Sequence, residues 1–532
     1  MRHKGALQKP SWEGWAQTLT HAQVAICSFL GIVLWASLGC GSSSSPRFTT
    51  AVAATANPLV AQYSIQHFQP GRTAWVEFGT DTNYGRQTSV VSDAVSGSLG
   101  PEVDILVAGM RPETTYHMRA HVDGPNGSWV DQDQTFVTGA IPPAQSLPQF
   151  TVTRPSSTAS PAAGVEALSL VNTSTTGLQG VVTDLDGNVI WYCPGEAIPF
   201  KPMQNGHFMF MRGNALEEVD LACNSIRTVT VDQLNQSLQA HLLQDPSYSF
   251  PTLDALHHDM LALPNGHWIA LGQITKSVTA NGYGTLDVAG DVLTDIDPNG
   301  DVVWAWSAFD HLDINRHLFG LPDWTHSNAL VYTADGNLLL SMRGQSWILK
   351  IDYADGAGKG DILWRLGQDG DFAISGGDPS KWFYAQHYPA ILNVSGSKTT
   401  LSVFDNGNFR IDSGLVACGS SSSAPACYTR AAILQIDEAT KIVSLQWEYL
   451  PGFFSFWGGA TTVLANGNVE FDSSEPYNAF DSTGPFNPLE SLIIEVTQTS
   501  TPEVVWQMTV TGENAYRGFR IPSLYPGVTW QK

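Results

Sequence analysis

The sequence predicts an all-β protein, with a six-bladed β-propeller preceded by an N-terminal β-sandwich. Aromatic residues make up 10% of the 532 residues and charged residues only 14%, and the chain contains 49 glycines and 30 prolines. This composition, with β-branched residues throughout and few helical periodicities, is typical of many short strands joined by turns. A repeated unit fills the C-terminal two thirds of the chain. At this length more than one domain is expected.

The N-terminus carries a targeting signal. An apolar run from Val24 to Gly39 follows a basic segment and ends directly before Cys40. We interpret residues 1–40 as a signal peptide of the lipoprotein type, with Cys40 as the lipidated residue, and residues 41–47 as a Ser-rich tether. A simple cleaved signal and an uncleaved anchor remain as alternatives. In each case we expect the mature protein outside the cytoplasm, in the periplasm or cell envelope.

Four cysteines lie beyond the signal region, and an oxidising compartment favours two disulfides. Cys418 and Cys427 flank a short loop containing Gly, Ser, Ala and Pro, and are predicted to pair with each other. This leaves Cys193 and Cys223 as the second pair. Neither pair has zinc-ligand spacing with nearby histidines, so a structural role is predicted for both.

Residues 48–140 are predicted to form the β-sandwich. Short strands such as Ala74–Gly79 alternate with turns. The segment Leu106–Tyr116, closed by Thr135–Thr138, resembles a fibronectin type III sandwich, in which the tyrosine packs at a strand corner. We interpret this region as an accessory domain. The Pro- and Ser-rich residues 141–164 are predicted to be a linker.

Residues 165–532 contain the repeat. In each unit an Asn-Gly or Asp-Gly turn joins two apolar strands, and an Asp-x-x-Gly turn and a strand ending in Trp follow further on. The first turns are Asn205-Gly206, Asn265-Gly266, Asp335-Gly336 and Asn466-Gly467, and the tryptophans are Trp191, Trp304, Trp364, Trp447 and Trp506. With a less regular unit around Lys201–Val231, about six copies fit. This predicts a propeller whose first strands surround a central channel, with an array of β-sandwiches as the alternative.

Three units open with histidine on the predicted inner strand, in His257–Asp259, His326–Asn328 and Gln386–His387. One such histidine is more often structural, but three at equivalent positions are expected to converge on one channel. Arg343 lies in the otherwise apolar strand predicted after the second of them, and a buried arginine needs an anion. The alternative for Arg343 is a structural ion pair with a channel aspartate such as Asp259.

Three histidines can also bind zinc. The neighbouring Arg343 counts against this, because a fixed cation repels a metal ion and attracts an oxyanion. The formal net charge of −23 and the lack of any run of basic residues exclude nucleic acid as a partner. Any anion site must therefore be a local, convergent cluster.

In order and approximate spacing, these motifs resemble the PAPS-independent arylsulfotransferases of the bacterial periplasm. The resemblance covers roughly residues 150–532. It is carried by the His-Asp strand before Leu263-Pro-Asn-Gly266, by Asp323–Asn328, by Ser341–Gln345, by Gln386-His387, by Phe404–Asn408 and by the closing segment Tyr516–Tyr525.

The resemblance implies transfer of a sulfuryl group from a phenolic sulfate ester to a phenol acceptor, without a nucleotide donor, cofactor or metal. His387 would become a sulfo-histidine, while His326, Arg343 and His258 would hold the sulfuryl oxygens and handle protons. Asn328 would be an additional substrate-binding donor. The repeat leaves the choice between His257 and His258 open; we favour His258 for catalysis and keep His257 as a substrate-binding residue.

Two other functions remain open from the sequence. The chain can be a non-catalytic propeller lipoprotein that displays a binding face, because a fold does not fix a function. It can also be a metal-dependent hydrolase or lyase on the same fold. Contact with a membrane is expected only through the lipid anchor, and the oligomeric state, a homodimer included, stays open.

Overall fold

The computed structural model describes residues 48–92, 102–125, 127–143, 147–171, 180–195, 199–244, 252–420, 424–478 and 489–531. The predicted signal peptide, the tether and Cys40 lie outside these residues. Residues Phe48–Lys532 form one compact unit. Strands make up 51% of the structure and helices 5%, which confirms the all-β prediction. Among the described helices, none combines the length and apolar character that crossing a membrane requires.

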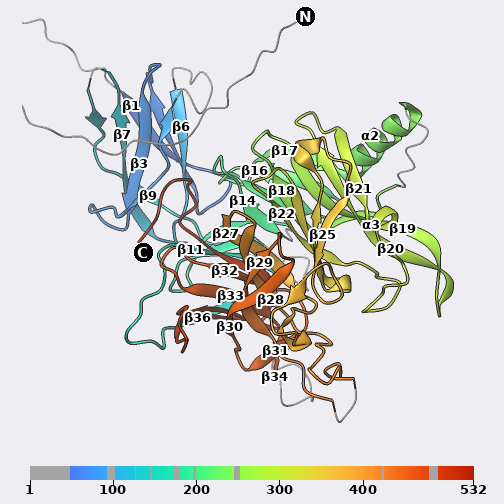
Figure 1. Ribbon diagram of the computed structural model, residues 1–532. Helices are drawn as coiled ribbons and strands as arrows, with labels where there is room; N and C mark the ends of the chain where they lie inside the picture. Colours follow the sequence, from blue (N-terminus) through green and yellow to red (C-terminus); the bar gives the residue numbers. More distant parts are fainter. Residues whose placement is uncertain are drawn as a thin grey trace, which may run out of the picture. The chain divides into compact units, whose positions relative to one another are not determined.

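The N-terminal part consists of two sheets that share one core (Figure 1, blue). The first has the order β1 (Thr49–Ala54), β2 (Ala61–Gln66), β6 (Glu102–Val107). The second has the order β4 (Arg86–Gln87), β3 (Thr73–Gly79), β7 (Thr115–Asp123), β8 (Trp129–Val130), with β5 (Val91–Ser92) on β3 and β9 (Gln134–Val137) on β7. Alternate residues of β7 are buried, as in a sheet with one face on a core. The backbone N–H of Arg111 donates to the Tyr116 hydroxyl at 2.9 Å.

The remaining described strands form six sheets of four or five strands, which we number I to VI, and one small ribbon. Sheet I has the order β13 (Val189–Cys193), β12 (Gly180–Thr183), β11 (Val165–Val171), β37 (Asn514–Ile521). Sheet II contains β14 (Phe200–Pro202), β15 (Phe208–Arg212), β16 (Ala215–Val219) and β17 (Ser225–Thr230). Sheet III contains β18 (Ala255–Ala262), β19 (Trp268–Ala280), β20 (Gly284–Ile296) and β21 (Val302–Ser307).

Sheets IV to VI continue the series. Sheet IV contains β22 (Ser327–Tyr332), β23 (Leu338–Met342), β24 (Trp347–Ile351) and β25 (Ile362–Leu366). Sheet V contains β27 (His387–Ser395), β28 (Lys398–Asp405), β29 (Arg430–Asp437), β30 (Ile442–Tyr449) and β26 (Ala373–Ile374). Sheet VI contains β32 (Ala460–Val463), β33 (Val469–Ser474), β35 (Glu490–Val496), β36 (Val504–Thr511) and β10 (Gln149–Thr153), and the ribbon pairs β31 (Phe453–Ser455) with β34 (Pro476–Asn478).

The predicted turns and tryptophans occupy equivalent places in these sheets. The Asn-Gly and Asp-Gly turns join the first two strands of sheets II, III, IV and VI, and their glycines have φ of 86°, 84°, 78° and 86°. The five tryptophans of the repeat lie in β13, β21, β25, β30 and β36. First strands of successive sheets contact one another, β18 with β22, β22 with β27 and β27 with β32. Side chains from the start of each repeat are therefore brought together.

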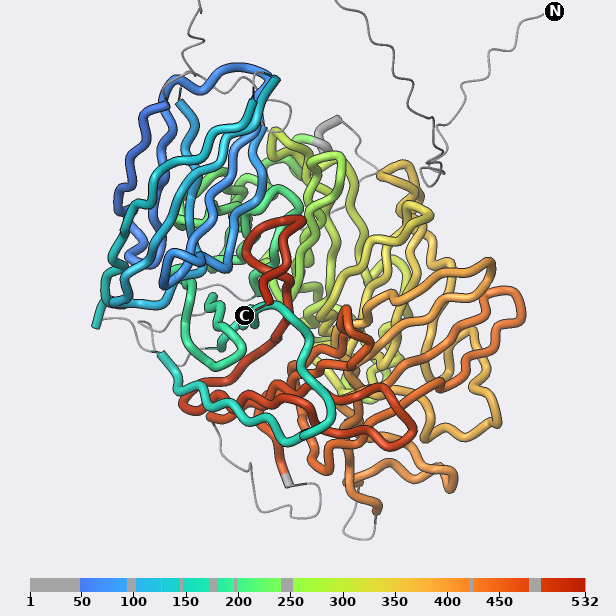
Figure 2. The backbone as a smooth tube through the Cα atoms, turned by 90° about the vertical axis from the view of Figure 1, so that its left-hand side faces the viewer, coloured from blue at the N-terminus to red at the C-terminus, as the bar shows by residue number. Residues whose placement is uncertain are grey.

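The two ends of the repeat region are interlocked. The last strand, β37, pairs with β11 over Val165–Val171, and β10 pairs with β36. Figure 2 shows the teal β10 segment beside the red C-terminal strands. The C-terminal strand thereby joins a sheet whose other strands come from the beginning of the repeat.

One helix departs from the predicted pattern of strands. Helix α2 (Val231–Gln244) follows sheet II, and Leu234 and Leu238 are buried, as expected for an apolar stripe with helical spacing. The hydroxyl of Ser237 accepts the backbone N–H of Val302 at 2.9 Å, so the helix is fixed to sheet III. A second helix, α3 (Ala308–His311), is a single turn.

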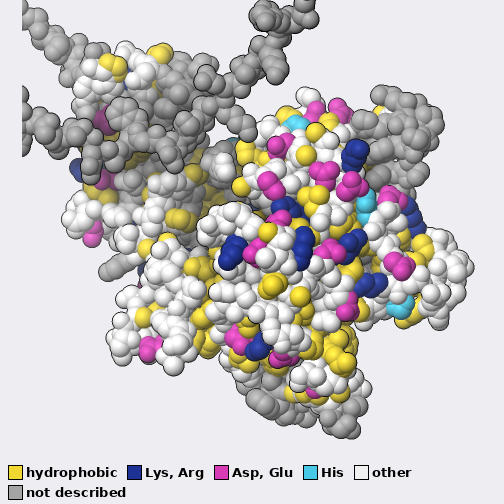
Figure 3. Space-filling view, viewed as in Figure 1, with side chains coloured by type: hydrophobic (Ala, Val, Ile, Leu, Met, Phe, Trp, Pro, Cys, Tyr) yellow, Lys and Arg dark blue, Asp and Glu magenta, His cyan; other side chains and the backbone are white. Residues whose placement is uncertain are grey.

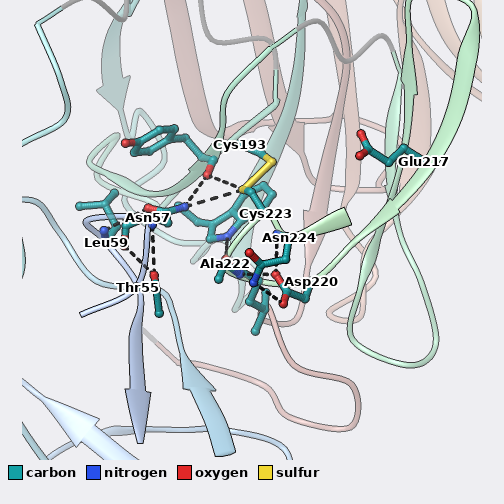
Figure 4. The surroundings of a disulfide bond; sticks show 12 residues. Thr55, Asn57, Leu59, Cys193, Glu217, Asp220, Ala222, Cys223 and Asn224 are labelled. Carbon is teal, nitrogen blue, oxygen red and sulfur yellow. Dashed lines mark hydrogen bonds between the residues drawn. A yellow bond between two sulfur atoms is a disulfide. The ribbon is translucent and has the colours of Figure 1, made fainter. Parts of the chain in front are cut away.

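Both predicted disulfides are present, Cys418–Cys427 and Cys193–Cys223. Figure 4 shows the second one, which joins β13 to the turn before β17. Beside it, the Asn57 side-chain amide donates to the carbonyl of Tyr192 at 2.8 Å and accepts the backbone N–H of Leu59 at 3.0 Å. These contacts fix the loop between β1 and β2 against sheet I.

Candidate active site

The three predicted histidines lie at the starts of three neighbouring sheets. His258 is in β18, His326 directly precedes β22, and His387 is the first residue of β27. The ladders of these strands are irregular at the same places, between Leu256 and Met260, between Ser327 and Ala329, and between His387 and Ala390. His258 and His326 have positive φ, 59° and 46°. Such irregularities redirect side chains and concentrate at functional sites.

His387 is almost fully buried, and its tautomer is determined by Asn406. Its Nδ1 lies 2.7 Å from Asn406 Oδ1, while Asn406 Nδ2 donates to the carbonyls of Ser455 and Gly458 at 2.9 and 3.1 Å. Because the amide nitrogen is used in this way, the oxygen faces the imidazole and Nδ1 must carry the proton. Burial and the charge of Arg343 hold the pKa of His387 well below its ordinary value, although the bond to Asn406 opposes this. His387 is therefore neutral, with a free lone pair on Nε2.

His258 lies at the centre of the group. The centroid of its ring is 4.8 Å from that of His326, and its Nδ1 is 2.8 Å from His257 Nδ1. His257 Nε2 is 3.3 Å from Asp291 Oδ1, an ion-pair distance without hydrogen-bond alignment. Burial, followed by the charges of His257, His326, His387 and Arg517, holds the pKa of His258 well below its ordinary value.

His326 is partly exposed, with 29% of its side chain accessible. Its Nδ1 lies 2.5 Å from a carboxylate oxygen of Asp323. The carboxylate orients the ring and holds a proton on Nδ1, so that Nε2 is left for proton exchange with a substrate.

Arg343 lies one residue beyond the strand in which the sequence placed it. The strand β23 ends at Met342, and Arg343 begins the 3₁₀ turn Arg343–Gln345. Only 8% of the residue is exposed, Nη2 donates to the carbonyl of Phe456 at 3.2 Å, and the buried Nε has no hydrogen-bond partner among the described residues. No described carboxylate lies within 4.0 Å of the guanidinium, and the charge of Asp323 acts on Arg343 only from farther away.

The alternative pairing of Arg343 with Asp259 is wrong. Asp259 is fully buried and lies 2.6 Å from Lys201 Nζ and 3.3 Å from Arg517 Nη1. Its other oxygen accepts the backbone N–H of Leu330 at 2.7 Å. Two cations thus share this carboxylate, and neither of them is Arg343.

Arg517 and Tyr516 of β37 join the site, although the sequence supplied no chemical reason to select them. Arg517 is fully buried and donates from Nη2 to the carbonyl of Asn328 at 2.7 Å. The Tyr516 ring lies 5.8 Å from that of His258 and 6.2 Å from that of His387, and its buried hydroxyl has no partner among the described residues. Burial raises the pKa of Tyr516 to about 12, so the phenol stays protonated and can donate.

Asn328 contacts the backbone directly before His387. Its Nδ2 donates to the carbonyl of Gln386 at 2.7 Å, and the side chain is fully buried. This contact links sheet IV to the start of β27, while the Asn328 Oδ1 has no hydrogen-bond partner among the described residues.

Three buried cations lie around the neutral imidazoles of His258 and His387. Lys201 and Arg517 share Asp259, and Arg343 has no carboxylate within 4.0 Å in the described part of the chain, whose full sequence has a formal net charge of −23. Buried charge of this kind is compensated by an anionic group. Within the described part of the chain, no group of three or more His, Cys, Asp or Glu side chains is arranged to hold a metal ion.

Comparison with solved structures gives only weak likenesses. A protein of unknown function from Bacteroides caccae is 10% identical, with a TM-score of 0.39, over 68% of this chain and 100% of that one. A mutant of the Synechocystis apocarotenoid oxygenase is also 10% identical, with a TM-score of 0.28, over 87% of this chain and 81% of that one. A streptogramin B lyase has 10% identity and a TM-score of 0.28, over 60% of this chain and 94% of that one. At these TM-scores the likenesses carry no argument.

No curated protein sequence matches the chain. The sequence model described as Arylsulfotransferase (ASST), however, matches residues 154–520. The match spans well over half of the chain and includes His258, His326, Arg343 and His387. The protein therefore belongs to the arylsulfotransferase (ASST) family.

Proposed function

We propose that this protein moves a sulfuryl group from a phenolic sulfate ester to a phenol in two steps, through a sulfo-histidine at His387. No nucleotide donor and no metal take part in this scheme. Membership of the ASST family supports sulfotransferase activity, and the chemistry of the site supports the finer assignment.

The observation that carries the proposal is the bond between His387 Nδ1 and Asn406 Oδ1 at 2.7 Å. A neutral imidazole with its proton on Nδ1 presents the Nε2 lone pair as a nucleophile. Once Nε2 is bonded to sulfur the ring becomes cationic, and the amide oxygen stabilises the remaining N–H. Because an amide oxygen is not basic, it does not take that proton away.

Arg343 is the anion-binding group in this scheme. Its buried Nε has no partner among the described residues, and no described carboxylate lies within 4.0 Å of the guanidinium. Charge that spreads over the sulfuryl oxygens during transfer attracts such a preorganised donor, as arginine clamps do for phosphoryl groups. The Tyr516 hydroxyl is a second donor of suitable placement, between His258 and His387.

Proton transfer is assigned to His326, with His258 beside it. His326 enters the cycle with a proton on each ring nitrogen. In the first step a bond forms between His387 Nε2 and sulfur, the sulfur–oxygen bond to the aryl group breaks, and His326 gives its Nε2 proton to the departing phenolate. In the second step His326 takes the proton of the acceptor phenol, whose oxygen bonds to sulfur as the nitrogen–sulfur bond breaks. Protons and charge balance over the two steps, and His387 is restored. His257 and Asn328 are positioning residues in this scheme. His257 orients the ring of His258, and Asn328 holds the backbone of Gln386 directly before His387.

We also propose that sheets I to VI are the six blades of a propeller over residues 165–532, and that residues 48–140 form a fibronectin III-like accessory domain. The contacts between first strands support the propeller. The bond from the Arg111 N–H to the Tyr116 hydroxyl, five residues on, supports the sandwich. Export with lipidation at Cys40 and assembly as a homodimer remain proposals from the sequence.

The test uses purified protein without its first 47 residues, a chromogenic aryl sulfate as donor, and a phenol as acceptor. We expect phenol-dependent release of the chromophore that persists with a chelator. In the absence of acceptor, the intact mass of the protein should increase by one sulfuryl group, on a peptide that contains His387.

The His387→Ala variant should lose both release and labelling. The matched control is His117→Ala, which removes a histidine of β7 that pairs with Asp133. Release that disappears with chelator would favour a metal-dependent hydrolase or lyase instead. An unlabelled protein that releases nothing from a range of aryl sulfates would favour the non-catalytic scaffold.

A further inference from the structure

Phe409 combines an exposed phenyl ring with an unfavourable backbone. It follows β28, 48% of the residue is exposed, and its φ is 56°. The left-handed region is uncommon for residues other than glycine, and a bulky side chain there is an outlier. Such conformations persist only where the surrounding structure enforces them, and they concentrate at ligand-binding sites.

The two neighbours of Phe409 enforce this conformation. Asn408 is 2% exposed and its Nδ2 donates to the carbonyl of Phe456 at 3.0 Å. Arg410 is 3% exposed and donates to Asp405 and to the carbonyl of Trp382, both at 2.8 Å. Because the side chains of both neighbours are buried, the ring of Phe409 points outward. This ring therefore does not contribute to the core.

The exposed ring of Phe409 is connected to Arg343 through the ring of Phe319. Phe409 lies 5.2 Å from the ring of Phe319 in an edge-on arrangement. Phe319 and Phe456 in turn lie 5.0 and 5.1 Å from the guanidinium carbon of Arg343. Phe456 is 42% exposed and Leu318, next to Phe319, is 50% exposed. Figure 3 shows hydrophobic side chains among the white atoms on the lower part of the face seen there.

We propose that Phe319, Phe409 and Phe456 form the surface that binds the aryl part of the substrate, and that this surface selects planar phenols with more than one ring. The inference rests on the proposed function. A sulfuryl group held at Arg343 places the attached ring beside Phe319 and Phe456, which both contact the guanidinium. Phe409 contacts Phe319 and lies one ring further out. A single-ring phenol therefore leaves Phe409 unused, whereas a second fused ring reaches it.

The chemistry of the three rings fits this substrate class. Phenyl rings bind other aromatic rings through edge-on and offset contacts, and the removal of apolar area from water adds to these contacts. Three phenylalanines on separate loops, at residues 319, 409 and 456, offer no hydrogen bonds from their side chains. The surface thus discriminates by aromatic area rather than by polar substituents.

The experiment compares phenol with naphthol as competing acceptors, with one common aryl sulfate donor, and measures the ratio of the two kcat/KM values. For the unmodified protein we expect the ratio to favour naphthol. In Phe409→Gly the ratio should fall by about tenfold, the equivalent of one aromatic contact. Glycine tolerates the positive φ, so this variant removes the ring without adding backbone strain.

Leu415→Gly is the matched control. Leu415 is on the same loop, has a φ of 62° and is 77% exposed, but has no aromatic contact. Its ratio should equal that of the unmodified protein. Phe456→Leu, which removes a ring beside Arg343 that both acceptors contact, should lower kcat/KM for both and leave the ratio nearly unchanged. An unchanged ratio in Phe409→Gly, with transfer intact, would overturn the inference alone, whereas no transfer to any phenol by the unmodified protein would overturn the proposed function.

Discussion

His387 donates its Nδ1 proton to Asn406 Oδ1 over 2.7 Å, and Asn406 is itself held by the carbonyls of Ser455 and Gly458. Asn406→Asp replaces the neutral acceptor with a carboxylate, which favours the charged imidazolium and raises the pKa of His387. The protonated ring has no free lone pair. We therefore expect the acid limb of the kcat/KM against pH profile to move to higher pH, measured with a chromogenic aryl sulfate.

Asn406→Leu separates the charge effect from the loss of the hydrogen bond. It leaves Nδ1 buried and unpaired, so kcat/KM should fall about 10- to 100-fold, with no upward shift of the acid limb. Identical pH profiles for the two variants would contradict the tautomer assigned to His387.

Arg343→Lys tests whether the fork of the guanidinium, and not only its charge, is needed. A lysine keeps the positive charge, but its ammonium group is a compact point charge and does not present the planar fork of N–H donors that can bind two sulfuryl oxygens at once. We expect kcat/KM to fall about 100- to 1000-fold, as when one preorganised donor is removed from a transition state. Arg365→Lys, at a half-exposed arginine 3.5 Å from Asp371, is the control and should retain activity. Equal losses in both variants would point to general destabilisation.

His257→Asn tests the coupling of His257 to the site. The charge of His257 is one of the causes that lower the pKa of His258, after burial. Its removal should raise the pKa of His258 toward the ordinary value, so that His258 becomes protonated at a higher pH. The acid limb of kcat/KM should then move upward by less than in Asn406→Asp. His317→Asn, which removes a histidine packed on Tyr283, should leave the profile in place. If His257→Asn also leaves it in place, His257 has no electrostatic role.

Local sequence signals predicted the framework of the site well. The residue pairs Asn265-Gly266 and Asp335-Gly336 predicted the first turn of a sheet, because glycine readily adopts the positive φ that such a turn requires. Both turns lie in the predicted place, and both glycines have positive φ. Because the histidines have fixed positions relative to these turns, the convergence of His258, His326 and His387 followed from the period of the repeat. The disulfide Cys418–Cys427 was also predictable from local sequence, because the two cysteines are close together in the chain.

Features that depend on long-range closure were missed. Tyr516 and Arg517 reach the histidines only because β37 pairs with β11, almost the full length of the repeat region earlier in the chain. No local pattern distinguishes Arg517, which is paired with Asp259, from Arg343, which has no carboxylate within 4.0 Å among the described residues. The exact end of β23 also escaped prediction: the strand ends at Met342, and Arg343 begins a 3₁₀ turn that follows it without a break.

Arg520 is surrounded by three buried carboxylates. Its Nε is 2.8 Å from Glu166 Oε2, its Nη2 is 2.8 Å from Glu470 Oε2 and its Nη1 is 3.0 Å from Glu495 Oε2. One cation cannot neutralise three anions. Burial and repulsion from Glu470 raise the pKa of Glu166 well above its ordinary value, and burial and repulsion from Glu495 raise the pKa of Glu470. Arg520 joins β37 to β11, β33 and β35. Protonation of Glu166 and Glu470 should therefore affect how stably the last strand of the repeat pairs with the first sheet.

The sign of the pH dependence follows from the raised pKa values. A carboxyl group that binds its proton more tightly in the folded state stabilises the fold fully below its unfolded pKa, and this contribution is lost as the pH rises through the folded pKa. The free energy of unfolding should therefore decrease toward alkaline pH. Glu166→Gln removes the titrating group, so we expect a flatter dependence and, above neutral pH, a gain on the order of 1 kcal/mol in urea denaturation. Glu217→Gln, at a carboxylate paired with Arg212, should keep the slope of the unmodified protein. If the free energy of unfolding of Glu166→Gln depended on pH as steeply as that of the unmodified protein, Glu166 would not be the group that binds the proton.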